Sequence, residues 1–140
     1  RYQYWPNAER YGMSMIRDFN RGNSGWTDWN LLLDERGGPN HVENFCFAPV
    51  HGDTQTGELI FTPSYYYIGH FSKFVQTEAQ RLSTSSNKGM LLATSFANVD
   101  GTMATIVMNM TEDAVDYSLF VGTAEAKLKI PARAMQTLTY

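Results

Sequence analysis

The chain has 140 residues, of which 43% are hydrophobic and 14% aromatic, so it can bury a packed core and is not a disordered segment. Its net charge is −3 and its lysines and arginines form no basic cluster, which argues against nucleic acid as a partner. No apolar run approaches the ~20 residues that a membrane-spanning helix needs, and the single cysteine excludes an internal disulfide.

The first predicted element is a helix over residues 8–19. Asn7 is a candidate N-cap, and Glu9 lies in the first turn, where a negative charge suits the helix dipole. Four apolar residues recur at helical spacing, namely Tyr11, Met15, Ile16 and Phe19. The stretch NRGNSG at residues 20–25 then ends the helix with two glycines.

The segment GWTDWNLLL, residues 25–33, is predicted to be a strand. Its alternation places apolar residues on both faces, which is typical of a parallel sheet covered by helices. Asp28 and Asn30 nevertheless lie inside the run, whereas a purely structural strand keeps such residues out of its interior. A helix, a short loop and a doubly buried strand together predict the end of an α/β repeat.

Residues 34–61 are interrupted by six glycines and prolines and are predicted to form a long irregular connection, in which functional sites are often built. A second helix is predicted from Thr62 to Val75, with Pro63 at its first position. Its apolar stripe consists of Tyr67, Ile68, Phe71, Phe74 and Val75.

After Gln80 the sequence period changes to two, which predicts an antiparallel sheet belonging to a β-sandwich. Strands are expected over residues 90–97, 102–110, 115–122, 126–130 and 134–140, with a further possible strand at 81–84 and a turn at 98–101. So few strands rarely make a complete sandwich, so we expect strands from elsewhere to complete it. The glycosylation sequon NMT at Asn109 falls inside one of these strands.

Carboxylates give a weak catalytic signal. Four of them lie in or just after the two-tryptophan segment, namely Asp28, Asp34, Glu35 and Glu43. Proximity in sequence does not establish the geometry that catalysis by two carboxyl groups needs. Solvated or capping loop acids are the plainer interpretation.

The histidines and the cysteine are equally weak candidates. His41, His51 and His70 lack metal-ligand spacing and are interpreted as surface or hydrogen-bonded structural residues. Cys46 is interpreted as a buried, inert thiol, because only a neighbouring base such as His51 would make it nucleophilic.

Trp26 and Trp29 are the strongest binding candidates. The apolar faces of a sugar ring lie well on an aromatic plane, and the indole N–H can donate to a hydroxyl group. The competing interpretation is a pair of ordinary core tryptophans. NHVENF, residues 40–45, adds amides and a ring, and its Asn44 can either read a hydroxyl group or cap a turn.

GWTDWNLLLDERGGPNHVENF (25–45), followed at a short interval by YYYIGHFSKFV (65–75), resembles the C-terminal portion of glycoside hydrolase family 30, the glucosylceramidase-like β-glycosidases. The resemblance runs from the first helix to the last strand. It implies an α/β + β fold, in which the last helix, strand and helix of a (β/α)8 TIM barrel precede most of an antiparallel β-sandwich. The implied domains are residues 1–80 for the barrel end and 81–140 for the sandwich, which strands preceding the barrel complete.

The resemblance also implies a function. Family members hydrolyse β-glycosides with retention, using two glutamates on the fourth and seventh barrel strands, upstream of the matched segment. No catalytic residue is therefore expected in this chain, which alone is expected to be inactive. Trp29 corresponds to the tryptophan of the last barrel strand that contacts the sugar, and Asn44 and Phe45 to residues lining the pocket mouth. His41 and Phe47 depart from the family pattern, on the side of the leaving group.

The expected partners are a β-glucoside or glucan substrate, such as glucosylceramide or β-1,6-glucan, and the remainder of the barrel, from the same polypeptide or another chain. No cofactor is implied, and the resemblance implies a secreted or periplasmic protein. Two alternatives remain open: a non-catalytic carbohydrate-binding module built on the sandwich, and a purely structural fragment.

Four apolar side chains are expected to need neighbours from other barrel repeats, namely Leu31, Leu33, Tyr67 and Phe71. Three arrangements would cover them: additional chains, a swapped oligomer, or docking of the first helix and strand onto the sandwich.

Overall fold

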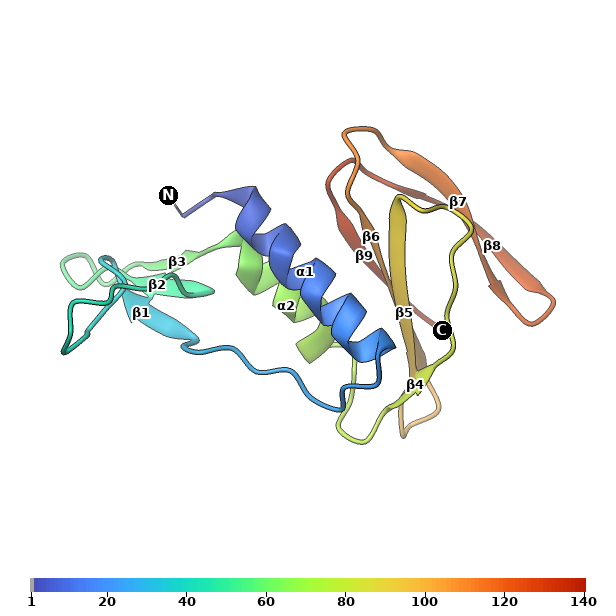
Figure 1. Ribbon diagram of the computed structural model, residues 1–140, viewed down its shortest axis with the longest axis horizontal. Coiled ribbons are helices and arrows are strands. Elements are labelled where there is room, and N and C mark those ends of the chain that lie inside the picture. Colours follow the sequence, from blue (N-terminus) through green and yellow to red (C-terminus); the bar gives the residue numbers. More distant parts are fainter. Residues whose placement is uncertain (1) are drawn as a thin grey trace.

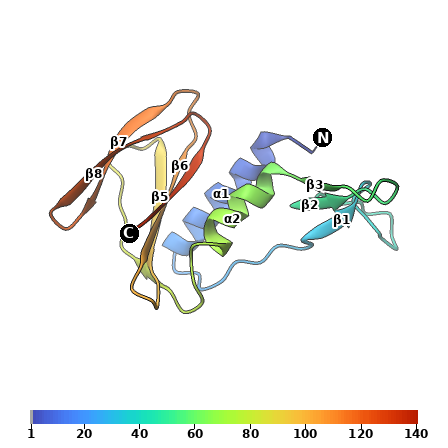
Figure 2. The ribbon, with the colours of Figure 1, turned by 180° about the vertical axis from the view of Figure 1, so that it is seen from behind.

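The computed structural model describes residues 2–140, and residue 1 of the predicted first domain lies outside the described residues. A small sheet, a pair of helices and a β-sandwich follow one another along the longest axis (Figure 1). The view from behind shows the same order (Figure 2). No helix within residues 2–140 has both the length and the apolar character needed to cross a membrane.

Helix α1 (Trp5–Asn20) begins three residues earlier than predicted. Tyr4 is its N-cap, and Pro6 lies in the first turn, where its missing N–H costs no hydrogen bond. The predicted N-cap at Asn7 was wrong, and so was the dipole role of Glu9, because the helix begins at Trp5, which places Asn7 inside the helix and Glu9 beyond its first turn.

Helix α2 (Pro63–Ser72) has Thr62 as its N-cap, as predicted, but ends three residues before Val75. The chain continues in turns, and the Val75 N–H still donates to the Phe71 carbonyl at 2.9 Å. The Thr62 hydroxyl does not cap the helix. It donates to the Pro49 carbonyl at 2.9 Å, which ties the start of α2 to the preceding loop.

The strand predicted over residues 25–33 is mostly unpaired, so this prediction was wrong for both tryptophans. Only β1 (Leu32–Asp34) is a strand, and it runs parallel to β2 (Val50–Gly52). A strand needs neighbouring backbone groups with which to exchange hydrogen bonds, and residues 25–30 have no strand partner within the described part of the chain, whereas the Leu31 carbonyl accepts the Val50 N–H at 3.1 Å.

The irregular connection predicted over residues 34–61 in fact contains two strands. One is β2, and the other is β3 (Leu59–Phe61), which pairs antiparallel with β2 through a hairpin. Asp53 stabilises the hairpin loop, because its Oδ1 accepts the Gln55 N–H at 2.8 Å and the Thr56 N–H at 3.0 Å.

Every strand predicted after residue 80 has a counterpart. The strands are β4 (Gln80–Leu82), β5 (Leu91–Ala97), β6 (Met103–Asn109), β7 (Val115–Val121), β8 (Ala124–Ile130) and β9 (Met135–Thr139). An antiparallel sheet of order β4-β5-β6-β9 lies next to the helices, and the β7-β8 hairpin lies on its far side (Figure 1). The division at residues 80 and 81 stays a prediction.

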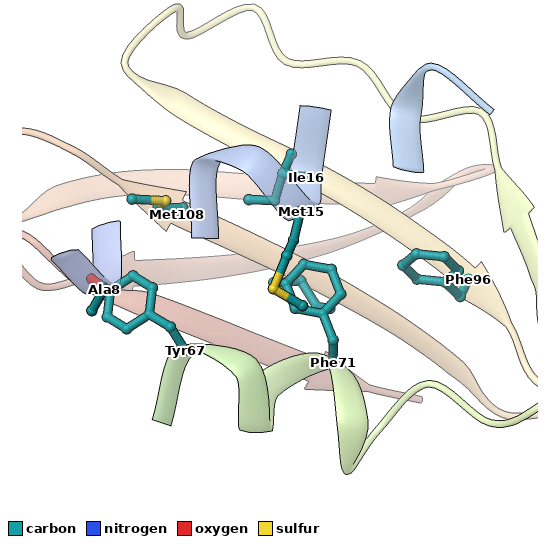
Figure 3. Close-up of a cluster of buried hydrophobic side chains, with 8 residues drawn as sticks. Ala8, Met15, Ile16, Tyr67, Phe71, Phe96 and Met108 are labelled. Atoms are coloured by element: carbon teal, nitrogen blue, oxygen red, sulfur yellow. The ribbon is translucent and has the colours of Figure 1, made fainter. Parts of the chain in front are cut away.

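The four-stranded sheet lies between the helices and the hairpin and packs against both. Side chains from one of its faces join α1 and α2 in the main core, which consists of Ala8, Met15, Ile16, Tyr67, Phe71, Phe96, Ile106 and Met108 (Figure 3). On the other face Leu91 and Val107 pack with Ile130 of β8. This division follows from strand alternation, which sends successive side chains to opposite faces.

The sandwich is loosely filled on its hairpin side. A cleft of about 1170 Å3 lies between the four-stranded sheet and the hairpin, with Leu91, Val107, Tyr117 and Leu128 in its lining. Completion of the sandwich by further strands stays a prediction.

Docking of the first helix onto the sandwich is confirmed, because α1 packs against β5, but docking of the first strand was wrong, because β1 pairs with β2 in a separate sheet. Leu33, Tyr67 and Phe71 are buried by other residues of this chain, contrary to the expectation that they need neighbours from other barrel repeats. Leu31 is 70% exposed, and β1 lies away from the sandwich at the other end of the helices (Figure 1).

Candidate functional site

The two tryptophans have opposite environments. Trp26 is half-buried and packs edge-on against Tyr11, with 5.5 Å between ring centroids, whereas the Trp29 side chain is 82% exposed. The Asp28 carboxylate lies between them in sequence and accepts from the Tyr11 hydroxyl at 3.2 Å and from the Trp29 N–H at 2.8 Å. The core interpretation therefore fits Trp26, while Trp29 presents its indole to the surroundings.

Residues 34–48, which we term the rim loop, are organised by Asp34. Its Oδ1 accepts the Gly38 N–H at 2.7 Å and the Arg36 N–H at 2.9 Å, and its own N–H donates to the Gly38 carbonyl at 2.7 Å. Donation from the Gly38 backbone, above all, holds the pKa of the Asp34 carboxyl below its ordinary value. Asp34 is thus an ionised turn former and not a proton donor.

Gly37 lets the two arms of the rim loop approach each other. The Cys46 N–H donates to the Gly37 carbonyl at 2.9 Å, and a Cβ on Gly37 would collide with the Cys46 carbonyl oxygen. The glycine φ of +94° also favours a residue without a side chain. Cys46 itself is half-buried, not buried as predicted, and its thiol lies 3.4 Å from the Asn44 carbonyl.

Hydrogen bonds from the Asn40 side chain hold the backbone of Asn44, the residue before Phe45. The Asn40 side chain accepts from the Asn44 N–H at 3.2 Å and donates to the Asn44 carbonyl at 2.9 Å. Turn capping is therefore the task of Asn40, and the Asn44 side chain is exposed. Phe45 is 42% exposed, with the Arg36 guanidinium 4.7 Å from its ring centroid.

The structure brings Asn44 and Phe45 together but does not join them to Trp29 by any hydrogen bond or ring contact described within residues 2–140. Trp29 precedes β1, and the other two follow it on the rim loop. All three side chains are exposed, and they lie before and after β1 in the sequence.

The remaining carboxylates fit the plainer interpretation. Glu35 accepts from the Thr54 N–H and hydroxyl, both at 3.0 Å, and donation from the Thr54 backbone holds the pKa of Glu35 below its ordinary value. A general acid needs a raised pKa, so neither Glu35 nor Asp34 suits that role. Glu43 is exposed on the rim loop at a φ of 58°.

The histidines are structural where they are buried. His51 bonds through both ring nitrogens, and His70 bonds to the Thr137 hydroxyl at 2.8 Å, with burial lowering the pKa of His70. His41 is exposed. Within residues 2–140 no group of three or more His, Cys, Asp or Glu side chains is arranged to hold a metal ion.

Sequence reasoning missed two contacts of the rim loop. Arg36 lies over Phe45, and His51 reaches back to Asp34 across 17 residues. Phe47, one of the departures from the family pattern, packs on His51 with 5.1 Å between ring centroids. No local sequence pattern predicts these contacts, because they form only when the loop closes.

Both parts of the chain match models of one family. Residues 1–75 match the glycosyl hydrolase family 30 TIM-barrel domain, and residues 78–138 match the family 30 β-sandwich domain. Putative glucosylceramidase 3 of Caenorhabditis elegans is 32% identical over 139 residues, covering 97% of this chain and 27% of the relative. Lysosomal acid glucosylceramidase of Mus musculus is 33% identical over 116 residues, covering 82% of this chain and 22% of the relative.

Solved structures agree with these matches. SrfJ from Salmonella typhimurium superposes with a TM-score of 0.94 at 35% identity, covering 97% of this chain and 31% of that one. The endo-β1,6-glucanase BT3312, at 24% identity, shows the same fold with a TM-score of 0.85, covering 94% of this chain and 30% of that one. The chain spans less than a third of the length of each of these four proteins. The chain therefore belongs to glycoside hydrolase family 30 and comprises the end of its TIM barrel and its β-sandwich domain.

Proposed function

We propose that this chain supplies part of the sugar pocket of a retaining β-glycosidase of the glucosylceramidase, β-glucosidase or β-1,6-glucanase type. The catalytic glutamates of that enzyme lie upstream, and the 140-residue chain alone is inactive. The observation that carries the proposal is the 82% exposed Trp29 side chain at the family's barrel end. Relatives named as glucosylceramidases and a glucanase of the same fold support the substrate class.

The proposed pocket uses three side chains of this chain. The Trp29 indole offers a flat apolar face for a sugar ring and an N–H for a hydroxyl group. Asn44 offers an amide to a second hydroxyl group, and Phe45 provides an aromatic edge at the pocket mouth. The low pKa values of Asp34 and Glu35 support placing acid/base chemistry elsewhere in the enzyme.

The wider organisation is part of the same proposal. Residues 1–80 form the barrel end and 81–140 the sandwich, and the remainder of the barrel is the main partner. We place the enzyme outside the cytosol, which the lysosomal relative supports, and expect a secreted or periplasmic location from the resemblance.

The test compares the intact enzyme, meaning the polypeptide together with its upstream part, with the 140-residue chain. The intact enzyme should hydrolyse 4-nitrophenyl β-glucoside with retention, seen as the β-anomer of the product by NMR. The chain alone should release no nitrophenol, and release by the chain would overturn the proposal. If the intact protein is inactive but the chain binds glucan through Trp29, non-catalytic carbohydrate binding is the better function.

A further inference from the structure

We propose that His51 is a positioning residue for this pocket, because its imidazole joins the two ends of the rim loop and so fixes where Asn44 and Phe45 stand. The inference rests on the proposed function. His51 lies on β2, outside the rim loop, and its side chain is completely buried.

Each imidazole nitrogen holds one end of the loop. Asp34 is the first residue of the loop, and its carbonyl oxygen lies 2.7 Å from His51 Nδ1. Ala48 is the last, and its N–H donates to His51 Nε2 at 3.1 Å. A backbone N–H can only donate, so Nε2 carries no hydrogen, and Nδ1 carries the hydrogen that Asp34 accepts. The geometry thus selects one tautomer.

Two aromatic rings fix the plane of the imidazole. The Tyr2 and Phe47 rings lie 4.9 Å and 5.1 Å from it, centroid to centroid. Tyr2 also donates its hydroxyl to the Glu35 carbonyl at 2.6 Å, next to Asp34 in the loop. The ring therefore has little freedom to turn away from either loop end.

A short series of hydrogen bonds connects His51 with the candidate binding residues. The Asp34 carbonyl that His51 holds also accepts the Gly37 N–H at 3.0 Å, and the Gly37 carbonyl accepts the Cys46 N–H at 2.9 Å. Cys46 is the direct neighbour of Phe45 in sequence. Closing a loop of this length costs chain entropy, so a side chain that bonds both ends stabilises one loop conformation over the others.

Three substitutions separate the contributions of the ring. His51→Phe keeps an aromatic ring between Tyr2 and Phe47 but removes both hydrogen bonds. His51→Asn places an amide N–H near the former Nδ1 and retains donation to Asp34. His51→Gln places an amide oxygen near the former Nε2 and retains acceptance from Ala48.

In the intact enzyme we expect His51→Phe to raise KM for 4-nitrophenyl β-glucoside by about tenfold or more, with kcat changed by less than about threefold. The KM values of His51→Asn and His51→Gln should each lie between those of wild type and His51→Phe. Amide hydrogen exchange at Gly38 and Cys46 should be fastest in His51→Phe, intermediate in the Asn and Gln variants and slowest in wild type, because loosening the loop ends exposes these N–H groups. NMR of the wild-type imidazole should show a protonated Nδ1 and an unprotonated Nε2.

His70→Phe is the matched control. His70 is a half-buried histidine whose side chain bonds to Thr137, and it lies on α2, outside the rim loop. Its substitution should lower stability without changing KM.

The failures are distinguishable. If the wild type hydrolyses the glucoside but His51→Phe leaves KM within about twofold, the positioning role is wrong and the proposed function stands. Unchanged exchange at Gly38 and Cys46, or a protonated Nε2, would also overturn it. If His51→Phe does not fold, the Asn and Gln variants decide by the same KM criterion. An inactive wild type would remove the proposed function and this inference together.

Discussion

The Arg133 guanidinium and the Glu9 carboxylate meet at 2.6 Å, although 124 residues separate them in sequence. Arg133 lies in the turn between β8 and β9, and its carbonyl accepts from the Trp5 indole at 2.9 Å and from the Tyr67 hydroxyl at 3.1 Å. One residue of the sandwich thus binds both α1 and α2.

The Glu9 carboxylate gives stability a predictable pH dependence. Burial raises the pKa of Glu9, Arg133 opposes the change, and the Glu112 carboxylate adds to it. Because the folded-state pKa lies above the ordinary value of 4.5, the stabilisation from this group is complete below that value and is lost as pH rises through the folded pKa.

Glu9→Gln should remove this dependence. Urea denaturation of wild type and variant at a series of pH values should show the variant gaining in relative stability from about pH 4 upward, because the amide has no charge to desolvate. The Arg133→Met variant is the companion, and it should lose about 1–3 kcal/mol near neutral pH because it leaves a buried carboxylate without its donor. A relative stability that falls with pH for Glu9→Gln would contradict the assignment.

The sandwich strands were predictable because their signal is local. Alternation in the segment from Leu91 to Ala97 and from Met103 to Asn109 is set by residues two apart, and the strand ends agree with prediction within one or two residues. Residues 25–33 show the limit of that signal, since apolar residues on both faces do not supply a partner strand. Only the end of that segment, where β2 pairs with it, forms a ladder.

Gly12 is a position where packing should defeat helix propensity. A Cβ there would lie 2.5 Å from Met135 Cε and 2.7 Å from Tyr67 Cδ1, inside the main core between the helices and β9. Alanine favours the helix by about 1 kcal/mol. Overpacking costs about 1–3 kcal/mol, so Gly12→Ala should lower the free energy of unfolding.

Gly69 provides the matched control for Gly12, because it is also helical and an added Cβ would meet nothing within 4 Å. In the 140-residue chain Gly69→Ala should raise the free energy of unfolding by up to about 1 kcal/mol. If Gly12→Ala instead raised the free energy of unfolding and Gly69→Ala lowered it, the contact between α1 and α2 would be looser than described.

The sequon at Asn109 should remain unmodified. The Asn109 side chain is completely buried, and its amide donates to the Asp113 carbonyl at 2.8 Å and to the Pro131 carbonyl at 2.9 Å. A folded chain offers no access to that nitrogen, although the sequence motif is complete. Intact mass spectrometry after expression in a glycosylating eukaryotic host should show no glycan here, and an occupied Asn109 would contradict the burial.

The candidate site was harder to predict than the sandwich. The residue types alone indicated Trp26, Trp29 and the segment 40–45, whereas the roles of Trp29, Asn44 and Phe45 came from the resemblance and stay predictions. Asp34 is interpreted from the sequence as a solvated or capping loop acid, but nothing in its neighbours shows that its side chain bonds to Gly38 and its carbonyl to His51. Such bonds depend on how the loop folds back.

We propose that Trp29 is exposed because it belongs to a sugar pocket, and two alanine variants test this. In the intact enzyme Trp29→Ala should lower kcat/KM for a β-glucoside by about tenfold or more while leaving the melting temperature almost unchanged. Trp26→Ala, which removes a half-buried ring, should instead lower the melting temperature. A Trp29→Ala enzyme with kcat/KM within about twofold of wild type would show that Trp29 does not belong to a sugar pocket.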